Sequence, residues 1–138
     1  MIRPEDRYHE PYMSLDELLG EINDGVVFWV YEEENTIIGV MGIQDRSDVS
    51  LIRHAYVRTH QRNSGMGTKL LTYLMDLTEK PILIGIWAAA DWAIRFYKKN
   101  GFDLVSSDDK DKLLKTYWNV PERQIATSVV LVRTTQPT

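Results

Sequence analysis

Hydrophobic and polar residues follow each other along the chain in patterns that predict both helices and strands. Apolar positions spaced three or four residues apart predict amphipathic helices, and runs of β-branched and aromatic residues predict strands. Ser14, with Glu17 three residues later, matches a capping box at the start of the first helix. The predicted helices are 14–24, 67–79, 92–99 and 108–118, with Gly25 as a left-handed residue after the first and Asp91 as the cap of the third. The predicted strands are 26–31, 36–44, 49–57, 82–87, 102–105 and 124–133.

The order of these elements indicates the class of fold. The first three strands are joined by short turns, the first of them at Glu34 and Asn35, and predict an antiparallel meander, while the later strands alternate with helices. Strand 36–44 is apolar on both faces, as expected of a central strand. We therefore expect an α/β fold of the α+β type, with a mixed, mostly antiparallel central sheet and helices on both faces. The buried helical positions are predicted to be Leu15, Leu18, Leu19 and Ile22 in the first helix, and Leu70, Leu71, Leu74 and Leu77 in the second.

Length and composition restrict the class of protein. The chain has 138 residues, 43% of them hydrophobic and 26% charged, which fits one soluble globular domain over 1–138. Within it, 1–13 is predicted to be an extended lead-in and 134–138 a frayed tail. No apolar run approaches the ~18 residues that span a membrane, and the first residues do not resemble a signal peptide. We expect a cytoplasmic protein.

Charge and cysteine content exclude further classes. The net charge is −4 and no basic patch is evident, which argues against nucleic-acid binding. The chain has no cysteine, so it has no disulfide, thiolate metal site or cysteine nucleophile. No metal site is expected.

A glycine-containing segment between a predicted strand and a predicted helix suggests an anion site. Glycine lets the backbone approach a ligand, and the first N–H groups of a helix lack partners and favour a phosphate. The alternative is an ordinary loop with two glycines. A dinucleotide-binding Rossmann domain is not expected, because the glycine spacing differs and no βαβ unit precedes the loop. The segment is Arg62, Asn63, Ser64, Gly65, Met66, Gly67 and Thr68.

Two motifs in the same order resemble those of the GNAT superfamily of N-acetyltransferases. Residues 62–67 resemble its R/Q-x-x-G-x-G/A motif, and residues 93–102, with Phe96, Tyr97, Gly101 and Phe102, resemble its A-x-x-F-Y-x-x-x-G-F segment. The resemblance implies that acetyl-CoA is the co-substrate and that N–H groups of Arg62 to Thr68 hold its pyrophosphate. It also implies a splayed strand pair at the cofactor site, where main-chain groups pair with pantetheine. Those groups would belong to Ala55, Tyr56 and Val57, and Tyr97 would also contact the cofactor. The side chains of Ala55 and Val57 are expected to pack in the core, so only their main chain would bind.

The resemblance further implies transfer of an acetyl group directly to an amine of a small molecule, an amino acid or a protein. The Val57 N–H would stabilise the oxyanion, and Tyr97 would be the acid that protonates the leaving thiolate. The alternative for Tyr97 is a packed aromatic. Arg53 is predicted either to bind a substrate carboxylate or to form a salt bridge. Strand alternation places His54 on the other face from Arg53, unless a bulge breaks the alternation. His54 is therefore expected to be a buried, hydrogen-bonded histidine, with a general base as the alternative, and no other general base is evident.

Two departures from the family pattern affect the expectations. Ala90 stands where the family often has an asparagine that contacts the cofactor. The chain also looks short at its N-terminus, which would leave strand 26–31 as an exposed edge that a homodimer could cover. Tyr117 and Trp118 are predicted either to line an acceptor site or to complete the core. Two other functions therefore stay open: a non-catalytic acyl-CoA-binding sensor and an interaction module on the same fold.

Overall fold

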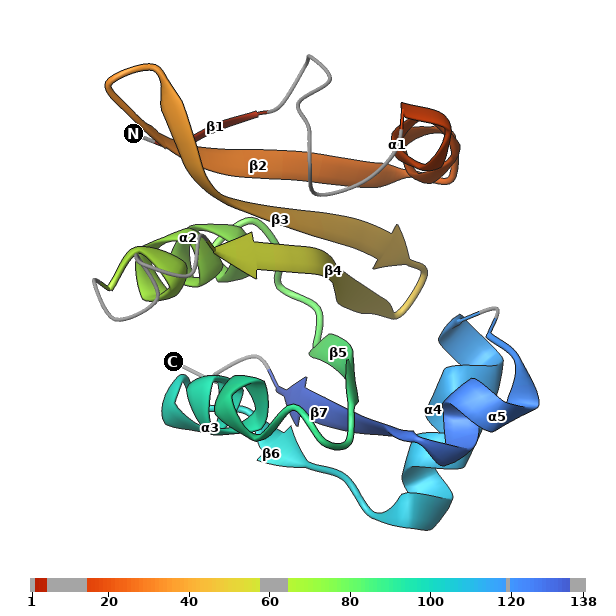
Figure 1. Cartoon of the computed structure of the whole chain (residues 1–138). Coiled ribbons are helices and arrows are strands. Elements are labelled where there is room, and N and C mark those ends of the chain that lie inside the picture. Colours follow the sequence, from red (N-terminus) through yellow and green to blue (C-terminus); the bar gives the residue numbers. More distant parts are fainter. Residues whose placement is uncertain (1, 5–14, 58–64, 119, 135–138) are drawn as a thin grey trace. The chain divides into compact units, whose positions relative to one another are not determined.

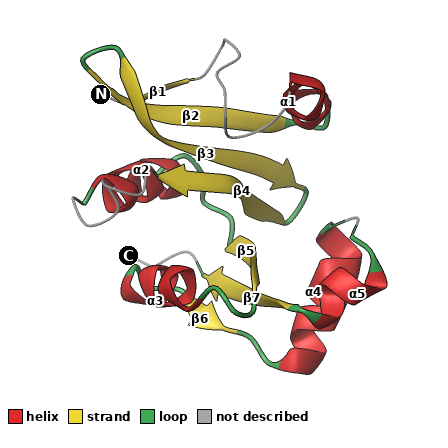
Figure 2. Cartoon of the chain, in the orientation of Figure 1, coloured by secondary structure: helices red, strands yellow, loops and turns green. Residues whose placement is uncertain are grey.

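The computed structural model describes residues 2–4, 15–57, 65–118 and 120–134, whose helices and strands are shown in Figures 1 and 2. The helices are α1 (Leu15–Asn23), α2 (Met66–Met75), α3 (Asp91–Lys99), α4 (Ser107–Tyr117) and α5 (Glu122–Ala126). The strands are β1 (Ile2–Pro4), β2 (Val26–Glu33), β3 (Thr36–Arg46), β4 (Val49–Val57), β5 (Ile82–Trp87), β6 (Asp103–Leu104) and β7 (Ser128–Arg133).

The described residues divide into two compact units. The first contains those up to Asp45 and those from Ile52 to Glu79, and the second contains Arg46–Leu51 and those from Lys80 onward. A single domain over 1–138 stays a prediction.

In the first unit, the strands follow one another in the order β1-β2-β3-β4, and the β1–β2 and β2–β3 pairs are antiparallel. Glu34 and Asn35 form the two-residue loop between β2 and β3, with φ of 49° and 65°. Positive φ at both positions is the geometry that matches the twist of a tight hairpin. The predicted turn and the start of the meander are confirmed. A buried cluster fills this unit: Leu18, Val26, Phe28, Val30 and Val40.

Strand β1 corrects two expectations about the N-terminal region. Ile2 pairs with Tyr31 and Pro4 pairs with Trp29, so part of the predicted lead-in is a strand. This strand covers the end of β2 that was expected to be an exposed edge. Three residues are too few to show a period-two pattern, and Pro4 lowers the strand propensity although proline is tolerated in edge strands. The homodimer stays a prediction.

Helix α1 forms where it was predicted, but its apolar face is only partly buried. Gly25 takes φ 95° just after the helix, as expected of a left-handed C-terminal residue. Leu18 is buried, whereas Leu19 is 55% exposed and Ile22 is also exposed. Ser14, the predicted cap, lies outside the described residues.

Helix α2 buries Leu70, Leu71 and Leu74 completely, as its apolar stripe predicts. It also contacts β2 through Tyr73 and Trp29, whose ring centres are 4.8 Å apart. The helix ends at Met75, before the predicted end at Glu79, so Leu77 falls beyond it and is 47% exposed. The prediction that Leu77 is buried is therefore wrong.

In the second unit, the strand order is β5-β7-β6, and both pairs are antiparallel. Helix α4 packs on this sheet through Leu114, and α5 packs through Ile125. The buried cluster of this unit is Val49, Leu51, Leu83, Leu114, Ile125 and Val130.

Helix α5 corrects the prediction that a strand begins at Gln124. Pro121 precedes the helix with extended backbone, and β7 begins only at Ser128. The β-branched Ile125 suggests a strand, but its side chain is buried and its carbonyl accepts a 2.7 Å hydrogen bond from the Lys110 ammonium. This tertiary contact outweighs local propensity.

The starts of α3 and α4 also differ from the prediction. Ala90, not Asp91, is the residue before α3, and Asp91 is the first helical residue. Helix α4 begins at Ser107, because the Ser106 hydroxyl accepts a hydrogen bond from the Asp109 N–H at 3.2 Å. Among the described residues, no helix has the length and apolar character needed to cross a membrane.

Candidate functional site

The end of β4 presents the backbone that was predicted to contact the cofactor. Ala55, Tyr56 and Val57 all belong to this strand, as expected. Ala55 and Tyr56 are exposed, so the expectation that the Ala55 side chain packs in the core is wrong. Pairing of their main-chain groups with pantetheine, and the oxyanion role of the Val57 N–H, stay predictions.

An irregularity interrupts β4 just before these residues. His54 takes φ 55°, which is rare for a residue with a side chain and marks a β-bulge-like distortion. The strict alternation expected along the strand is lost, since Leu51 and Ile52 are both buried while His54, Ala55 and Tyr56 are all exposed. The strand thus turns a run of consecutive residues toward solvent.

Arg53 is held by two neighbours in the first unit. Its Nη1 donates to Gln44 Oε1 at 2.8 Å, and its Nη2 lies 3.4 Å from Glu21 Oε2. Gln44 is completely buried and donates in turn to the Asp24 carbonyl at 2.8 Å. The salt bridge that was the alternative to carboxylate binding is therefore present. A substrate carboxylate would have to compete with Glu21 for the Arg53 guanidinium. Substrate binding by Arg53 stays a prediction.

His54 shares the same carboxylate. Its Nε2 lies 3.3 Å from Glu21 Oε2, and its side chain is 31% exposed, so the expectation of a buried histidine is wrong. Glu21 and Gln44 were not predicted as partners of these residues. No local pattern signals these contacts, because they join α1 and β3 to β4 across long stretches of chain.

The start of α2 has the geometry of an anion site. Gly65 precedes the helix with φ 83°, and the first helical hydrogen bond runs from the Lys69 N–H to the Gly65 carbonyl at 3.1 Å. The N–H groups of Met66, Gly67 and Thr68 therefore have no partner within the helix, and no side chain caps it. The first turn contains no acidic residue that would repel an anion. Arg62, Asn63 and Ser64 lie outside the described residues.

Tyr97 is buried in α3 of the second unit. Its side chain is 4% exposed and meets the rings of Phe96 and Phe102 edge-on, with centres 5.0 Å and 5.5 Å away. Burial raises the pKa of the Tyr97 phenol well above its ordinary value, so the hydroxyl keeps its proton. The packing role is thus evident for the ring, and the catalytic role of the hydroxyl stays a prediction.

Ala90 connects β5 to α3 through its backbone. Its N–H donates to the Trp87 carbonyl at 3.0 Å, and its carbonyl accepts the N–H groups of Ala93 and Ile94, both at 3.1 Å. The methyl group adds no side-chain hydrogen bond to the helix start. The backbone therefore forms this turn without the amide side chain that the family often has there.

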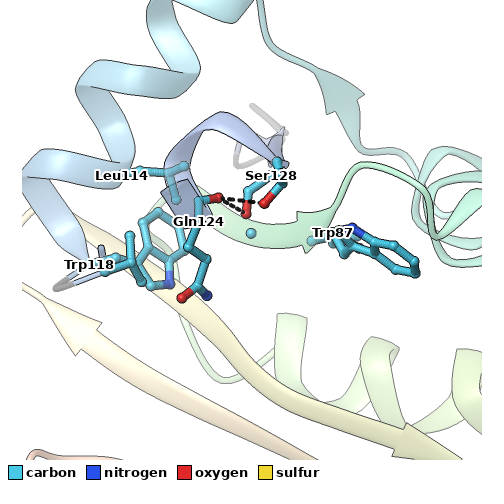
Figure 3. A pocket seen from close by; sticks show the side chains of 9 residues that line it. Trp87, Leu114, Trp118, Gln124 and Ser128 are labelled. Atoms are coloured by element: carbon cyan, nitrogen blue, oxygen red, sulfur yellow. Dashed lines mark hydrogen bonds between the residues drawn. The ribbon is translucent and has the colours of Figure 1, made fainter. Parts of the chain in front are cut away.

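A pocket of about 270 Å³ opens in the second unit (Figure 3). Trp118, Leu114 and Gln124 gather on one side of it, and Trp87 extends from the end of β5 on the other. Trp118 was one of the two residues that the sequence suggested for an acceptor site; the other lining residues were not foreseen. The lining residues are Gly85, Ile86, Trp87, Leu114, Trp118, Val120, Gln124, Thr127 and Ser128.

Tyr117, the other suggested residue, does not line this pocket. Its hydroxyl donates to the Asp48 carboxylate, 2.9 Å from Oδ1 and 3.0 Å from Oδ2. The hydrogen bond lowers the pKa of Asp48 and raises the pKa of Tyr117. Tyr117 therefore ties α4 to the turn between β3 and β4.

Comparisons with solved structures show which fold this is. The chain is 20% identical to a GNAT family acetyltransferase from Elizabethkingia anophelis with acetyl-CoA bound, with a TM-score of 0.71 over 97% of each chain. It is 15% identical to an acetyltransferase from Streptococcus agalactiae, with a TM-score of 0.73 over 96% of this chain and 98% of the other. An IAA acetyltransferase from Bacillus cereus is 18% identical, with a TM-score of 0.71 over 96% and 97%. The mixed, mostly antiparallel fold class is confirmed.

Sequence comparison identifies the family. A search of curated proteins gives no match. A family model described as acetyltransferase (GNAT) domain matches residues 24–104, which is more than half of the chain and includes both motifs. The chain belongs to the GNAT family of acetyltransferases.

Proposed function

We propose that this protein transfers an acetyl group from acetyl-CoA directly to an amine. The observation that carries the proposal is the start of α2, where three N–H groups without helical partners follow a left-handed Gly65. This start lies within the segment that matches the family model. A solved relative with the same fold has acetyl-CoA bound, which supports the choice of co-substrate.

In this proposal, the first unit holds the cofactor. The N–H groups of Met66, Gly67 and Thr68 bind the pyrophosphate together with residues 62–65, and the helix dipole favours its negative charge. The main chain of residues 55–57 pairs with the pantetheine amides. The exposure of Ala55 and Tyr56 supports this role, because a buried strand end would not be accessible.

The reaction needs a nucleophilic amine, an oxyanion donor and a route for the leaving thiolate. The amine nitrogen attacks the thioester carbonyl, a C–N bond forms, the C–S bond breaks, and the sulfur leaves as the CoA thiolate. The Val57 N–H donates to the oxyanion of the intermediate. The nitrogen loses a proton to solvent or to a base, and the thiolate gains one.

The buried Tyr97 hydroxyl is suited to donating a hydrogen bond to the leaving sulfur. A phenol has a reference pKa of ~10 and a thiol one of ~8.5, so complete proton transfer from tyrosine to a thiolate is uphill. The burial that raises the pKa of Tyr97 increases this difference. We therefore assign Tyr97 to stabilising the thiolate by a hydrogen bond, and the proton that the thiolate finally gains comes from solvent.

The other expectations remain part of the proposal. The acceptor is an amine of a small molecule, an amino acid or a protein, and a reaction that consumes acetyl-CoA fits a cytoplasmic location. A homodimer would be detected by light scattering on a sizing column, and a clean monomer at high concentration would contradict it.

Calorimetry with acetyl-CoA tests the cofactor assignment. Gly65→Glu places a carboxylate at the start of α2 and is expected to abolish binding. Gly20→Glu is the matched control, because it adds the same charge at a position in α1 where a side chain meets nothing within 4 Å. Normal binding by Gly65→Glu would refute the assignment of the loop.

Release of free thiol from acetyl-CoA in the presence of a panel of amines tests the transfer. Amine-dependent thiol release is expected. Tight binding of acetyl-CoA without thiol release for any amine would favour the acyl-CoA sensor, and absence of binding would favour the interaction module.

A further inference from the structure

We propose that the pocket in the second unit binds the body of the acceptor, and that the acceptor is an amine with an aromatic or aliphatic body and no carboxylate or phosphate group. That the ligand is the acetyl acceptor rests on the proposed function. The chemical class of the ligand is argued from the residues that line the pocket. Its volume of about 270 Å³ suits a small molecule.

One side of the pocket is apolar, because the side chains of Leu114 and Trp118 lie there next to the bare backbone of Gly85 in β5. A Cβ atom built there would lie 3.5 Å from both Leu114 Cδ2 and Trp118 Cζ2, which is ordinary van der Waals contact. The missing side chain therefore leaves room beside the edge of the indole. None of the nine lining residues carries a charge, so no side chain in this set can neutralise a carboxylate or a phosphate.

The other side of the pocket presents hydrogen-bond acceptors. The Ser128 hydroxyl donates to the Gln124 carbonyl at 2.6 Å, and the Thr127 hydroxyl donates to the Arg123 carbonyl at 3.1 Å. Each hydroxyl has a single hydrogen, so the lone pairs that remain can only accept. The lone pairs of these hydroxyls can therefore accept the N–H groups of an amine. The side-chain amide of Gln124, which can both donate and accept, lines the pocket as well.

Trp87 enlarges the apolar surface at the mouth of the pocket. Its indole extends from the end of β5 and is 65% exposed, an unusually large exposure for tryptophan (Figure 3). An aromatic body in the pocket would bring this indole within reach of a stacking or edge contact. The two indoles therefore favour a flat or aliphatic ligand over a polar one.

The pocket is linked within the same unit to the helix of Tyr97. β5 ends at Trp87, and only residues 88–90 separate it from α3. The Ala88 N–H donates to the Thr127 carbonyl at 2.8 Å, which fixes this connection to the pocket rim. The pocket rim and α3, the helix that contains Tyr97, are therefore consecutive along the chain.

The probe that we propose is 2-phenylethylamine, and its matched control is phenylalanine, which has the same body plus a carboxylate. Binding is followed by NMR of the tryptophan indole N–H signals, which does not depend on catalysis. The Trp118 signal is expected to shift with 2-phenylethylamine, and the dissociation constant for phenylalanine is expected to be at least about tenfold higher. The half-buried Trp29, whose Nε1 is inaccessible to solvent, serves as an internal reference in the first unit.

Two variants identify the site of binding. Gly85→Val fills the space beside Trp118, and Trp118→Leu removes the indole; each is expected to weaken 2-phenylethylamine binding about tenfold or more without changing acetyl-CoA affinity. Trp92→Leu, at another exposed tryptophan that does not line the pocket, is the control and is expected to bind the amine normally. Circular dichroism confirms that each variant is folded.

The outcomes separate this inference from the proposed function. Acetylation of 2-phenylethylamine with no Trp118 shift, or equal acetylation by Trp118→Leu and the intact chain, would overturn the pocket and leave the transferase activity standing. A shift of Trp118 with no acetylation of any amine would overturn the transferase activity and support the pocket as a binding site. Tighter binding of phenylalanine than of 2-phenylethylamine would overturn the class of ligand.

Discussion

Substitution of Gly65 by alanine tests the conformation on which the cofactor site depends. Gly65 has φ 83°, and a Cβ atom built there meets nothing within 4 Å. The new methyl group therefore clashes with no described neighbour, and the cost comes from the left-handed backbone alone. That cost is about 1–2 kcal/mol for a residue other than glycine.

Gly20→Ala is the control, and its expected effect on the free energy of unfolding has the opposite sign. Gly20 lies inside α1, has no positive φ, and also has open space around a Cβ atom. Alanine there is expected to stabilise the protein by roughly 0.5–1 kcal/mol, because glycine is a poor helix former. Gly65→Asn should cost less than Gly65→Ala, since asparagine tolerates the left-handed region better.

Urea unfolding measures the change in stability, and calorimetry with acetyl-CoA measures the change in affinity. If the backbone at Gly65 relaxes to avoid the strain, the N–H groups of Met66 to Thr68 no longer point at the pyrophosphate. Because 1.4 kcal/mol corresponds to a factor of ten, the dissociation constant is expected to rise by up to about tenfold.

Two results would refute this reasoning. Equal stabilisation by Gly65→Ala and Gly20→Ala would show that Gly65 is not left-handed in solution. A destabilised Gly65→Ala variant with unchanged acetyl-CoA affinity would show that the turn is a structural feature and not part of the cofactor site.

Three further substitutions test other parts of the structure. Tyr97→Phe keeps the ring packing and removes the hydroxyl, so kcat is expected to fall about 10- to 100-fold with unchanged acetyl-CoA affinity; equal kcat in steady-state assays would remove Tyr97 from the mechanism. Tyr117→Phe removes the hydrogen bond that lowers the pKa of Asp48, so its loss of stability should be present at neutral pH and disappear as the pH falls through that lowered pKa. Unfolding measured across this range checks it, and a difference independent of pH would contradict it. Gly42→Ala would place a Cβ atom 2.7 Å from Val26 Cγ1, so we expect a loss of about 1–3 kcal/mol in urea unfolding, whereas unchanged stability would show that the core of the first unit adapts.

Local signals in the sequence predicted the elements that depend on short-range physics. The turn at Glu34 and Asn35, the left-handed Gly25 after α1, and the buried leucines of α2 all follow from turn chemistry and helical periodicity, and the structure confirms them. The predicted ends of helices were less accurate than their central residues. Leu77 has the spacing of a buried residue, but α2 ends before it.

The elements that the sequence analysis missed depend on distant contacts. α5 forms where β-branched residues suggest a strand, because the Lys110 ammonium bonds to the Ile125 carbonyl and the Ile125 side chain is buried. β1 exists because β2 offers an unpaired edge. No window of local sequence contains either contact.

The candidate site likewise contains residues that local sequence could predict and residues that depend on distant contacts. The two family motifs located Gly65 and Tyr97, because glycine and aromatic positions at fixed spacing are visible in sequence. The pairing of Glu21 with Arg53 and His54 was not visible, since α1 and β4 are far apart in the chain. The pocket beside Gly85 was not visible either, because it depends on how α4 and α5 pack on β5.

Mass spectrometry of an amine after incubation with this protein and acetyl-CoA tests the central proposal most directly. With 2-phenylethylamine, we predict the N-acetylated product together with an equal amount of free coenzyme A thiol, and neither product above background with Gly65→Glu. Intact acetyl-CoA and unmodified amine, for this amine and for a panel of small-molecule, amino-acid and peptide amines, would contradict the assignment of this chain as an N-acetyltransferase.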